Sequence, residues 1–175
     1  RLLNLMNVNT VILPDNAEDT NGDNVLDDII AACEDNGTNV VYITHDTEFT
    51  AGAIRLSVYE SSERGSRDES GIMSTVSVGD YDMLVTGDVE KIVERELVSS
   101  HDLSGTELLI VPHHGSKYST SDELLSALRP ETAVISTGYN RYGHPTKETL
   151  DKLNEYGVNV LRTDELGRIV LHVAS

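Results

Sequence analysis

The feature that most constrains this chain is an apolar run that ends in a proline and two adjacent histidines, "LLIVPHHGS", at residues 108–116. Four consecutive aliphatic residues predict a strand that is buried on both faces. The chain contains only six histidines, and two of them follow this strand directly. A buried strand that ends in imidazole side chains indicates a functional site at the edge of a sheet.

Two further apolar runs end in a similar way. "DMLVTGD" (82–88) leads to Asp88, and "TAVISTGYNRYGHP" (132–145) leads to His144. Loops at the carboxyl ends of strands in α/β sheets converge on one crevice, so these side chains are expected to meet. An aspartate oxygen can bridge two cations, and neutral imidazole nitrogen suits Zn, Fe or Mn. Each turn alone also has a structural reading, because Asp88 fits a helix N-cap and His114 fits a simple turn residue.

The rest of the pattern predicts strands and helices in alternation, with an antiparallel stretch in the middle. Helices are expected at 24–37, 89–100, 121–130 and 146–157. Strands are expected at 7–14, 39–45, 53–60, 71–88 (a hairpin turning at Gly79 and Asp80), 107–112, 132–137, 158–163 and 167–174. This order predicts an α/β domain with a mixed sheet, or two sheets, covered by helices. A length of 175 residues suits one domain spanning 1–175.

The composition disfavours two classes of function, membrane contact and binding of nucleic acid. No apolar run approaches the roughly 20 residues of a membrane span, so no membrane contact is expected from this chain. The formal net charge is -17, and such a field repels phosphate backbones. The single cysteine, Cys33, is interpreted as a small buried side chain in a helix. His101 is expected in a solvated loop and His172 on a strand face, both outside any site.

Four stretches together resemble the second half of the metallo-β-lactamase-fold hydrolases, and more closely the metallo-β-lactamase-like domain of ComEC-type competence (DNA-uptake) proteins. They are "LVTGDVE", "LLIVPHHGSKYSTSDELL", "PETAVISTGYNRYGHPTKETLDKL" and "GVNVLRTDELGRIVL", all within residues 71–175. The resemblance implies an α/β fold of the αββα sandwich type with a dinuclear metal site at one edge. It also implies that the N-terminal part of that fold is missing from this chain, which makes 1–175 a truncated domain.

The resemblance assigns roles residue by residue. Asp88 matches the aspartate that bridges two metals, and His113 or His114 matches an element beside those metals. His144 matches a late histidine that binds a metal or contacts a substrate phosphate. Ser116 and Asn140 match polar positions that line the same crevice, and with His144 they are the candidate catalytic residues. The implied cofactors are two divalent metals in the intact protein, Zn or Mn, and the implied chemistry is attack by a metal-bound hydroxide.

One departure from the family pattern is plain. The principal metal motif, His-x-His-x-Asp-His, occurs nowhere in the sequence, and neither His45 nor His101 has that spacing. In the family this motif lies shortly before the point that matches the start of this chain. Either the motif lies in a preceding segment or the protein is a degenerate member. In both cases this chain alone is expected to bind two metals weakly and to be inactive.

Two functional hypotheses follow. The first is a metal-dependent hydrolase of a phosphodiester or other small anionic substrate, with DNA as a substrate only of the full-length protein. A ComEC-like protein would carry this domain on the extracellular face of a bacterial membrane. The second is a non-catalytic module that binds a ligand or partner through the same crevice. An open sheet edge without the first strands of the fold also predicts a homodimer.

Overall fold

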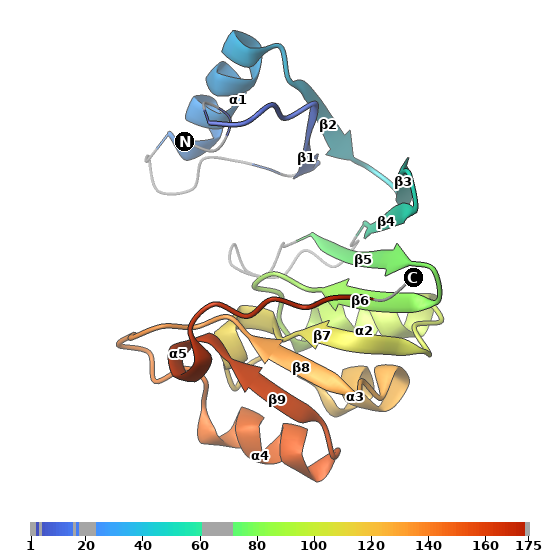
Figure 1. Cartoon of the computed structure of the whole chain (residues 1–175), viewed down its shortest axis with the longest axis vertical. Coiled ribbons are helices and arrows are strands. Elements are labelled where there is room, and N and C mark those ends of the chain that lie inside the picture. Colours follow the sequence, from blue (N-terminus) through green and yellow to red (C-terminus); the bar gives the residue numbers. More distant parts are fainter. Residues whose placement is uncertain (1–2, 4, 16, 18–23, 61–71, 174–175) are drawn as a thin grey trace.

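The structure is a computed structural model that describes residues 3, 5–15, 17, 24–60 and 72–173. Its N-terminal part is a small β-α-β unit, formed by β1 (Thr10–Pro14), α1 (Val25–Asn36) and β2 (Asn39–Ile43). β1 and β2 pair in parallel as a separate two-stranded sheet. In Figure 1 this unit stands apart from the large sheet, above it in the view.

The large sheet has seven strands in the order of the sequence. They are β3 (Thr47–Ala51), β4 (Ile54–Tyr59), β5 (Met73–Val78), β6 (Tyr81–Val85), β7 (Thr106–Ile110), β8 (Thr132–Ile135) and β9 (Asn159–Arg162). The first four strands are antiparallel neighbours, whereas β6 to β9 run parallel. Parallel neighbours need crossover connections, and helices provide them here. The predicted mixed α/β sheet is therefore confirmed.

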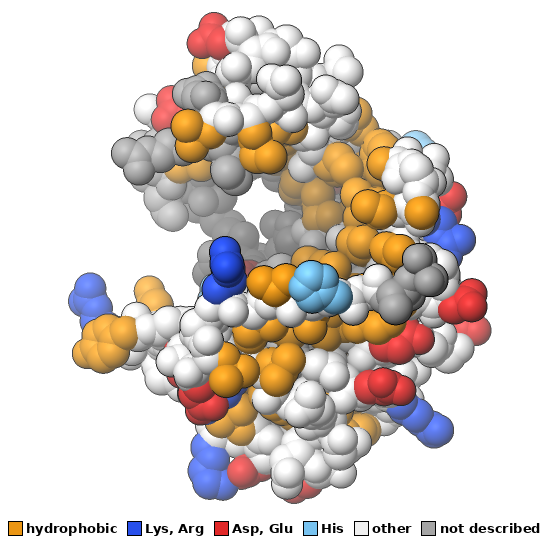
Figure 2. Space-filling view, in the orientation of Figure 1, with side chains coloured by type: hydrophobic (Ala, Val, Ile, Leu, Met, Phe, Trp, Pro, Cys, Tyr) orange, Lys and Arg blue, Asp and Glu red, His pale blue; other side chains and the backbone are white. Residues whose placement is uncertain are grey.

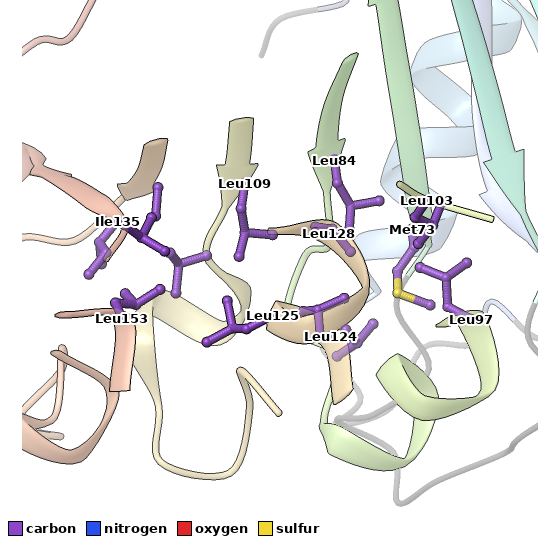
Figure 3. Close-up of a cluster of buried hydrophobic side chains, with 14 of the residues drawn as sticks. Met73, Leu84, Leu97, Leu103, Leu109, Leu124, Leu125, Leu128, Ile135 and Leu153 are labelled. Carbon is purple, nitrogen blue, oxygen red and sulfur yellow. The ribbon is translucent and has the colours of Figure 1, made fainter. Parts of the chain in front are cut away.

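Three helices cover one face of the parallel half: α2 (Lys91–Ser100), α3 (Asp122–Leu128) and α4 (Lys147–Glu155). Their leucine and valine side chains share one buried cluster with alternate residues of the strands, among them Leu84, Leu109 and Ile135. Figure 3 shows these side chains meeting between the strands and the helices. Because side chains alternate across a strand, one face of the sheet supplies all of these contacts.

The helix boundaries follow local signals in the sequence. Ser121 accepts a hydrogen bond from the Leu124 backbone N–H, and Thr146 accepts one from the Thr149 N–H, so both act as the predicted N-caps. Gly37 ends α1 in the left-handed conformation, as predicted. Asn24 stands at the N-cap position of α1, but its side chain makes no capping bond.

The opposite face of the sheet is more open. On the face seen in Figure 2, apolar side chains gather along the sheet below the β1–α1–β2 unit. The chain after β9 forms one helical turn, α5 (Thr163–Leu166), and then crosses in front of the sheet. A hollow of about 630 Å³ lies beside this crossing segment, between the β5–β6 turn and His172.

Two predictions about strands were wrong. Residues 167–173 form no strand, so His172 lies on an exposed crossing segment and not on a strand face. β3 was not predicted at all. Among the described residues, no helix is long and apolar enough to span a membrane.

Candidate functional site

The predicted site residues follow three neighbouring strands, and two hydrogen bonds fix the first two strand ends together. The Thr86 hydroxyl donates to the Ile110 carbonyl at 2.9 Å, and the His113 backbone N–H donates to the Gly87 carbonyl at 2.9 Å. As a result Asp88, after β6, lies beside His114, after β7. Their closest atoms, Asp88 Oδ1 and His114 Nε2, are 3.8 Å apart, and both side chains are about half exposed.

The two histidines stand in an unusual backbone conformation. They lie in a short turn, η2 (Pro112–Gly115), where His113 has φ 50° and His114 has φ 55°. Two successive non-glycine residues in the left-handed region carry backbone strain, and such strain concentrates at functional sites.

Close packing holds this turn in place. Gly115 has φ +82°, and a Cβ atom there would lie 2.6 Å from Pro145 Cβ. The Thr146 N–H donates to the Gly115 carbonyl at 2.9 Å. Only glycine fits such a contact, so the turn after β7 is locked against the loop that carries His144.

The orientation of His114 is set by a backbone contact. Its Nδ1 lies 2.6 Å from the Ser136 carbonyl oxygen. A carbonyl can only accept, so Nδ1 carries the proton in this bond. In the neutral ring the lone pair is then on Nε2, the atom that faces Asp88. A backbone carbonyl that fixes the tautomer in this way is the usual outer partner of a metal-binding histidine.

His113 lies deeper than His114 and contacts His144. Their rings meet edge to face with centroids 5.6 Å apart. His113 Nδ1 is buried and lacks a hydrogen-bond partner among the described residues. Burial lowers the pKa of His144, and the nearby His113 and His114 lower it further, against a raising effect of Asp88. A His144 ring that stays neutral at neutral pH can accept a proton or a hydrogen bond.

The donor set fits one side of a metal site. Metal bonds to imidazole and carboxylate are about 2.0–2.2 Å long, so two ligands of one ion lie within roughly 4.4 Å of each other. The 3.8 Å between Asp88 and His114 satisfies this limit. In the part of the chain that the structure describes, however, no three metal-type side chains come together. These residues therefore supply part of a ligand set.

The site opens onto a hollow of about 360 Å³. Its walls come from the two loops after β7 and β8: His114, Ser136, Thr137, Gly138, Asn140, Tyr142 and His144. Three predicted site residues, His114, Asn140 and His144, line this hollow. Asp88 joins them only through its contact with His114.

Ser116 and Asn140, predicted as catalytic, have structural contacts instead of free polar groups. Ser116 is buried, and its hydroxyl accepts a bond from the Tyr118 N–H at 3.3 Å. The Asn140 amide donates to the His144 carbonyl at 2.7 Å, and its oxygen accepts from the His144 and Tyr142 N–H groups. Asn140 lines the hollow as expected, whereas the buried Ser116 is not among the residues that line it. Their catalytic role stays a prediction, and these contacts favour a supporting one.

The alternative reading of Asp88 as a helix cap was wrong. α2 begins at Lys91, its N-cap position is Glu90, and no side chain caps it. The Asp88 carboxylate is more than half exposed, and its Oδ1 lies 3.8 Å from His114 Nε2. Asp88 therefore does not have the helix-capping role that the sequence left open.

Sequence reasoning missed Glu94, a carboxylate with no exposed surface. Its two oxygens accept bonds of 2.6 Å from the Thr120 and Ser121 N–H groups, which lie at the end of the histidine loop. The signal was present, because Glu94 stands next to Val93 and three residues before Leu97, on the apolar face of α2. Glu94 ties α2, which follows Asp88, to the loop that carries His114.

His101 was also misplaced by the sequence reasoning, which put it in a solvated loop. Its ring is mostly buried at the end of α2, with Nε2 2.7 Å from Asp46 Oδ2. The ring also packs on Tyr59 at a centroid distance of 4.6 Å. His101 therefore joins α2 to the β2–β3 turn and lies outside the candidate site.

The chain is similar to curated competence proteins. It is 38% identical over 111 residues to ComE operon protein 3 of Bacillus subtilis, covering 63% of this chain and 14% of that protein. It is 38% identical over 112 residues to competence protein ComA of Neisseria gonorrhoeae, covering 62% and 16%. Recombination protein 2 of Haemophilus influenzae is 37% identical over 95 residues, covering 54% and 12%. The chain thus matches about one seventh of the length of these relatives. No protein-family model matches the chain.

Solved structures show the same fold at low sequence identity. A metallo hydrolase from the archaeon Ignicoccus hospitalis aligns with TM-score 0.54 at 14% identity, covering 90% of this chain and 77% of the other. CmlA, a diiron β-hydroxylase from Streptomyces venezuelae, aligns with TM-score 0.57 at 12% identity, covering 89% and 38%. Together with the mixed sheet and the helix layer, these findings show a metallo-β-lactamase-like fold in a chain that resembles part of ComEC-type competence proteins.

Proposed function

We propose that this domain contributes to the site of a metal-dependent hydrolase that cleaves a phosphodiester. The observation that carries the proposal is the 3.8 Å contact between Asp88 Oδ1 and His114 Nε2 at the mouth of a hollow that His144 also lines. The similarity to competence proteins favours DNA as the substrate of the full-length protein. The imidazole and carboxylate ligands suit Zn or Mn as the metal.

Asp88, His114 and His144 have different roles in this proposal. Asp88 and His114 hold the metal side of the site, where a divalent ion would supply a hydroxide nucleophile and stabilise the developing oxyanion. His114 is kept in one tautomer by the Ser136 carbonyl. His144 faces the hollow with a lowered pKa, because of burial and its histidine neighbours, and contacts a phosphoryl oxygen or accepts a proton.

A non-catalytic binding module is the second candidate, and one observation favours it. The described residues bring no three metal-type side chains together, and the sequence lacks the His-x-His-x-Asp-His motif. A chain with two ligands would bind a metal weakly and turn over slowly. The hollow would then bind an anionic ligand or a partner without cleaving it.

Two measurements distinguish the hydrolase from the binding module. They are calorimetric titration of this chain with Mn²⁺ and Zn²⁺, and an assay of bis(p-nitrophenyl) phosphate hydrolysis. We expect weak metal binding that Asp88→Ala and His114→Gln each abolish. The matched control is His45→Gln, an exposed histidine in the β2–β3 turn, which should bind as the wild type does.

Metal-dependent hydrolysis that Asp88→Ala removes supports the enzyme. Metal binding that survives Asp88→Ala, or is lost equally in His45→Gln, overturns the assignment of the site. If metal binds at Asp88 and His114 but no hydrolysis follows even at saturating metal, the binding module is the better description of this chain.

A further inference from the structure

The loop that follows the histidine turn, residues 116–121, has no helix or strand of its own, yet two helices hold its backbone. From α2, the Lys91 ammonium donates to the Lys117 carbonyl at 2.7 Å. From α4, the Thr149 hydroxyl donates to the Ser116 carbonyl at 3.1 Å. Because the loop has no regular hydrogen-bond ladder, bonds of this kind to the two helices fix its path.

Thr120 is the residue of this loop on which both helices act. Its N–H donates to Glu94 Oε1, in α2, at 2.6 Å, and its carbonyl accepts from the Lys152 ammonium, in α4, at 3.0 Å. The Lys152 ammonium also lies 3.4 Å from Asp122 Oδ2. Hydrogen bonds to charged groups are stronger than bonds between neutral groups. The peptide groups on both sides of Thr120 are therefore held in fixed directions.

Thr120 is held in a conformation that its side chain disfavours. It has φ 58°, in the left-handed region, which a β-branched residue rarely occupies. Thr120 has no exposed surface, and its hydroxyl lacks a hydrogen-bond partner within the described residues. Both features destabilise the folded chain. Backbone strain of this kind persists only where surrounding contacts impose it, and it is concentrated near functional sites.

The loop is joined directly to the histidine turn. The Ser116 N–H donates to the His113 carbonyl at 3.0 Å, so a shift of the loop passes into the turn. The next residue of that turn, His114, keeps its ring orientation through the 2.6 Å contact of Nδ1 with the Ser136 carbonyl. A loop that left its path would therefore move the His114 ring away from this carbonyl.

We propose that Glu94 and Lys152 are positioning residues that act on the candidate site through Thr120. These three residues form a clamp between α2 and α4. The clamp holds the loop in the path that directs Nε2 of His114 toward Asp88. This inference rests on the proposed function, because it names what keeps His114 in one orientation before a metal or substrate binds. Side chains that support a site in this way determine its geometry without touching the ligand.

The test measures the tautomer of His114 by nitrogen-15 nuclear magnetic resonance of the full chain without metal. It is done at about pH 8.5, where histidine side chains are neutral, and the signals missing from His114→Gln identify those of His114. In the wild type we expect the proton on Nδ1. Lys152→Met removes the donor to Thr120 and should give a mixture of the two tautomers. Lys152→Arg keeps a donor and should keep the single tautomer.

Thr120→Gly distinguishes positioning from a contribution to stability alone. Glycine adopts the left-handed region without strain, so the loop keeps its path when the bond from α4 is absent. In a chain that carries Thr120→Gly, Lys152→Met should therefore leave His114 in one tautomer. The matched control is Asp122→Asn, which removes the charge of Asp122 beside Lys152 but leaves the bond to Thr120. It should keep the single tautomer.

A single His114 tautomer in Lys152→Met overturns the clamp, and so does a mixture in the wild type or an equal mixture with and without Thr120→Gly. Glu94→Gln weakens the bond on the other side of Thr120 and should give the same mixture as Lys152→Met, which provides a second test. The measurement needs neither metal nor substrate. A tautomer that ignores these variants removes the clamp alone, whereas a tautomer that follows them without metal binding or hydrolysis removes the hydrolase alone.

Discussion

The β1–α1–β2 unit and the body from β5 to β9 differ in how they are held together. Every member of the main apolar cluster lies between Met73 and Val158. In the described part of the N-terminal unit, only Cys33, Thr38 and Ile43 are buried. The body therefore has its own core and carries all of the candidate site, whereas the unit before it is thinly packed.

This difference means that the candidate site is supported by the packed body of the domain. Asp88, His114 and His144 lie in the turns and loops that follow β6, β7 and β8, and these strands pack on the helix layer. The N-terminal unit reaches the body through the β3–β4 hairpin and through the Asp46–His101 contact. Loss of packing in the body should therefore disturb both fold and site, and loss of packing in the unit should disturb neither.

The largest effect is expected from a cavity in the body. Leu109, with no exposed surface, lies in the middle of the sheet (Figure 3). Leu109→Ala should lower the free energy of unfolding by about 3–5 kcal/mol, because removed methyl groups leave a cavity in a dense core. Ile43→Ala, at a buried position of β2, should lower the free energy of unfolding clearly less. The few side chains packed around Ile43 can move into the space that the removed atoms leave. Urea unfolding followed by circular dichroism measures both, and equal losses would mean that the two regions share one core.

An intermediate effect is expected at Glu94, which joins α2 to the histidine loop. Glu94→Gln places an amide NH₂, which cannot accept a hydrogen bond, against one of two backbone N–H groups. The free energy of unfolding should therefore fall by about 1–3 kcal/mol. Urea unfolding measures this cost, and Glu155→Gln, at an exposed glutamate in α4, is the control. If the loop matters for the site, Glu94→Gln also weakens Mn²⁺ binding at Asp88 and His114, which a purely global loss of stability would not do under native conditions.

The pH dependence of this effect has a definite sign. Burial raises the pKa of Glu94 above its usual 4.5, although the bonds from Ser121 and Thr120 oppose the rise. A raised pKa in the folded state means that the contribution of Glu94 is complete below about pH 4.5 and declines as the pH rises through the raised value. The difference in unfolding free energy between wild type and Glu94→Gln should therefore shrink from acidic toward neutral pH. A difference that grows over this range would contradict the raised pKa.

The predictions that the structure confirmed rest on strong local patterns in the sequence. The helix caps at Ser121 and Thr146 and the apolar runs of β6, β7 and β8 are local patterns, and they placed Asp88, His114 and His144 at neighbouring strand ends. β3 lacked such a pattern, since "TEFTA" carries a single large apolar residue. Residues 167–173 had the alternation of a strand, but a strand also requires a paired neighbour, and this segment crosses the sheet instead.

The roles of single polar side chains were harder to predict. Ser116 and Asn140 stand in the right stretches, yet whether a hydroxyl or amide faces a hollow or bonds its own loop depends on tertiary packing. Glu94 and His101 have partners 26 and 55 residues away in sequence, Thr120 and Asp46. No pattern within one element identifies such pairs, so the long-range polar contacts came only from the structure.

The smallest effect is expected at the contact between the two regions. Asp46 accepts bonds from His101 Nε2 at 2.7 Å and from the Glu60 N–H at 3.0 Å. Burial alone would raise the pKa of Asp46, but these bonds hold it below 3.8. Its contribution is therefore present above pH 3.8 and is lost as the pH falls through the lowered value. Because the carboxylate is about half exposed, Asp46→Asn should cost less than about 1 kcal/mol.

Hydrogen exchange by mass spectrometry shows where that small loss falls. In Asp46→Asn we expect faster exchange in β2, β3 and the last turn of α2, with β7 and β8 unchanged, because the main apolar cluster does not depend on this contact. Asp35→Asn, at an exposed aspartate near the end of α1, is the control and should leave all segments as they are. Faster exchange in β7 or β8 would show that the Asp46–His101 contact supports the body as well, and that the two regions unfold as one.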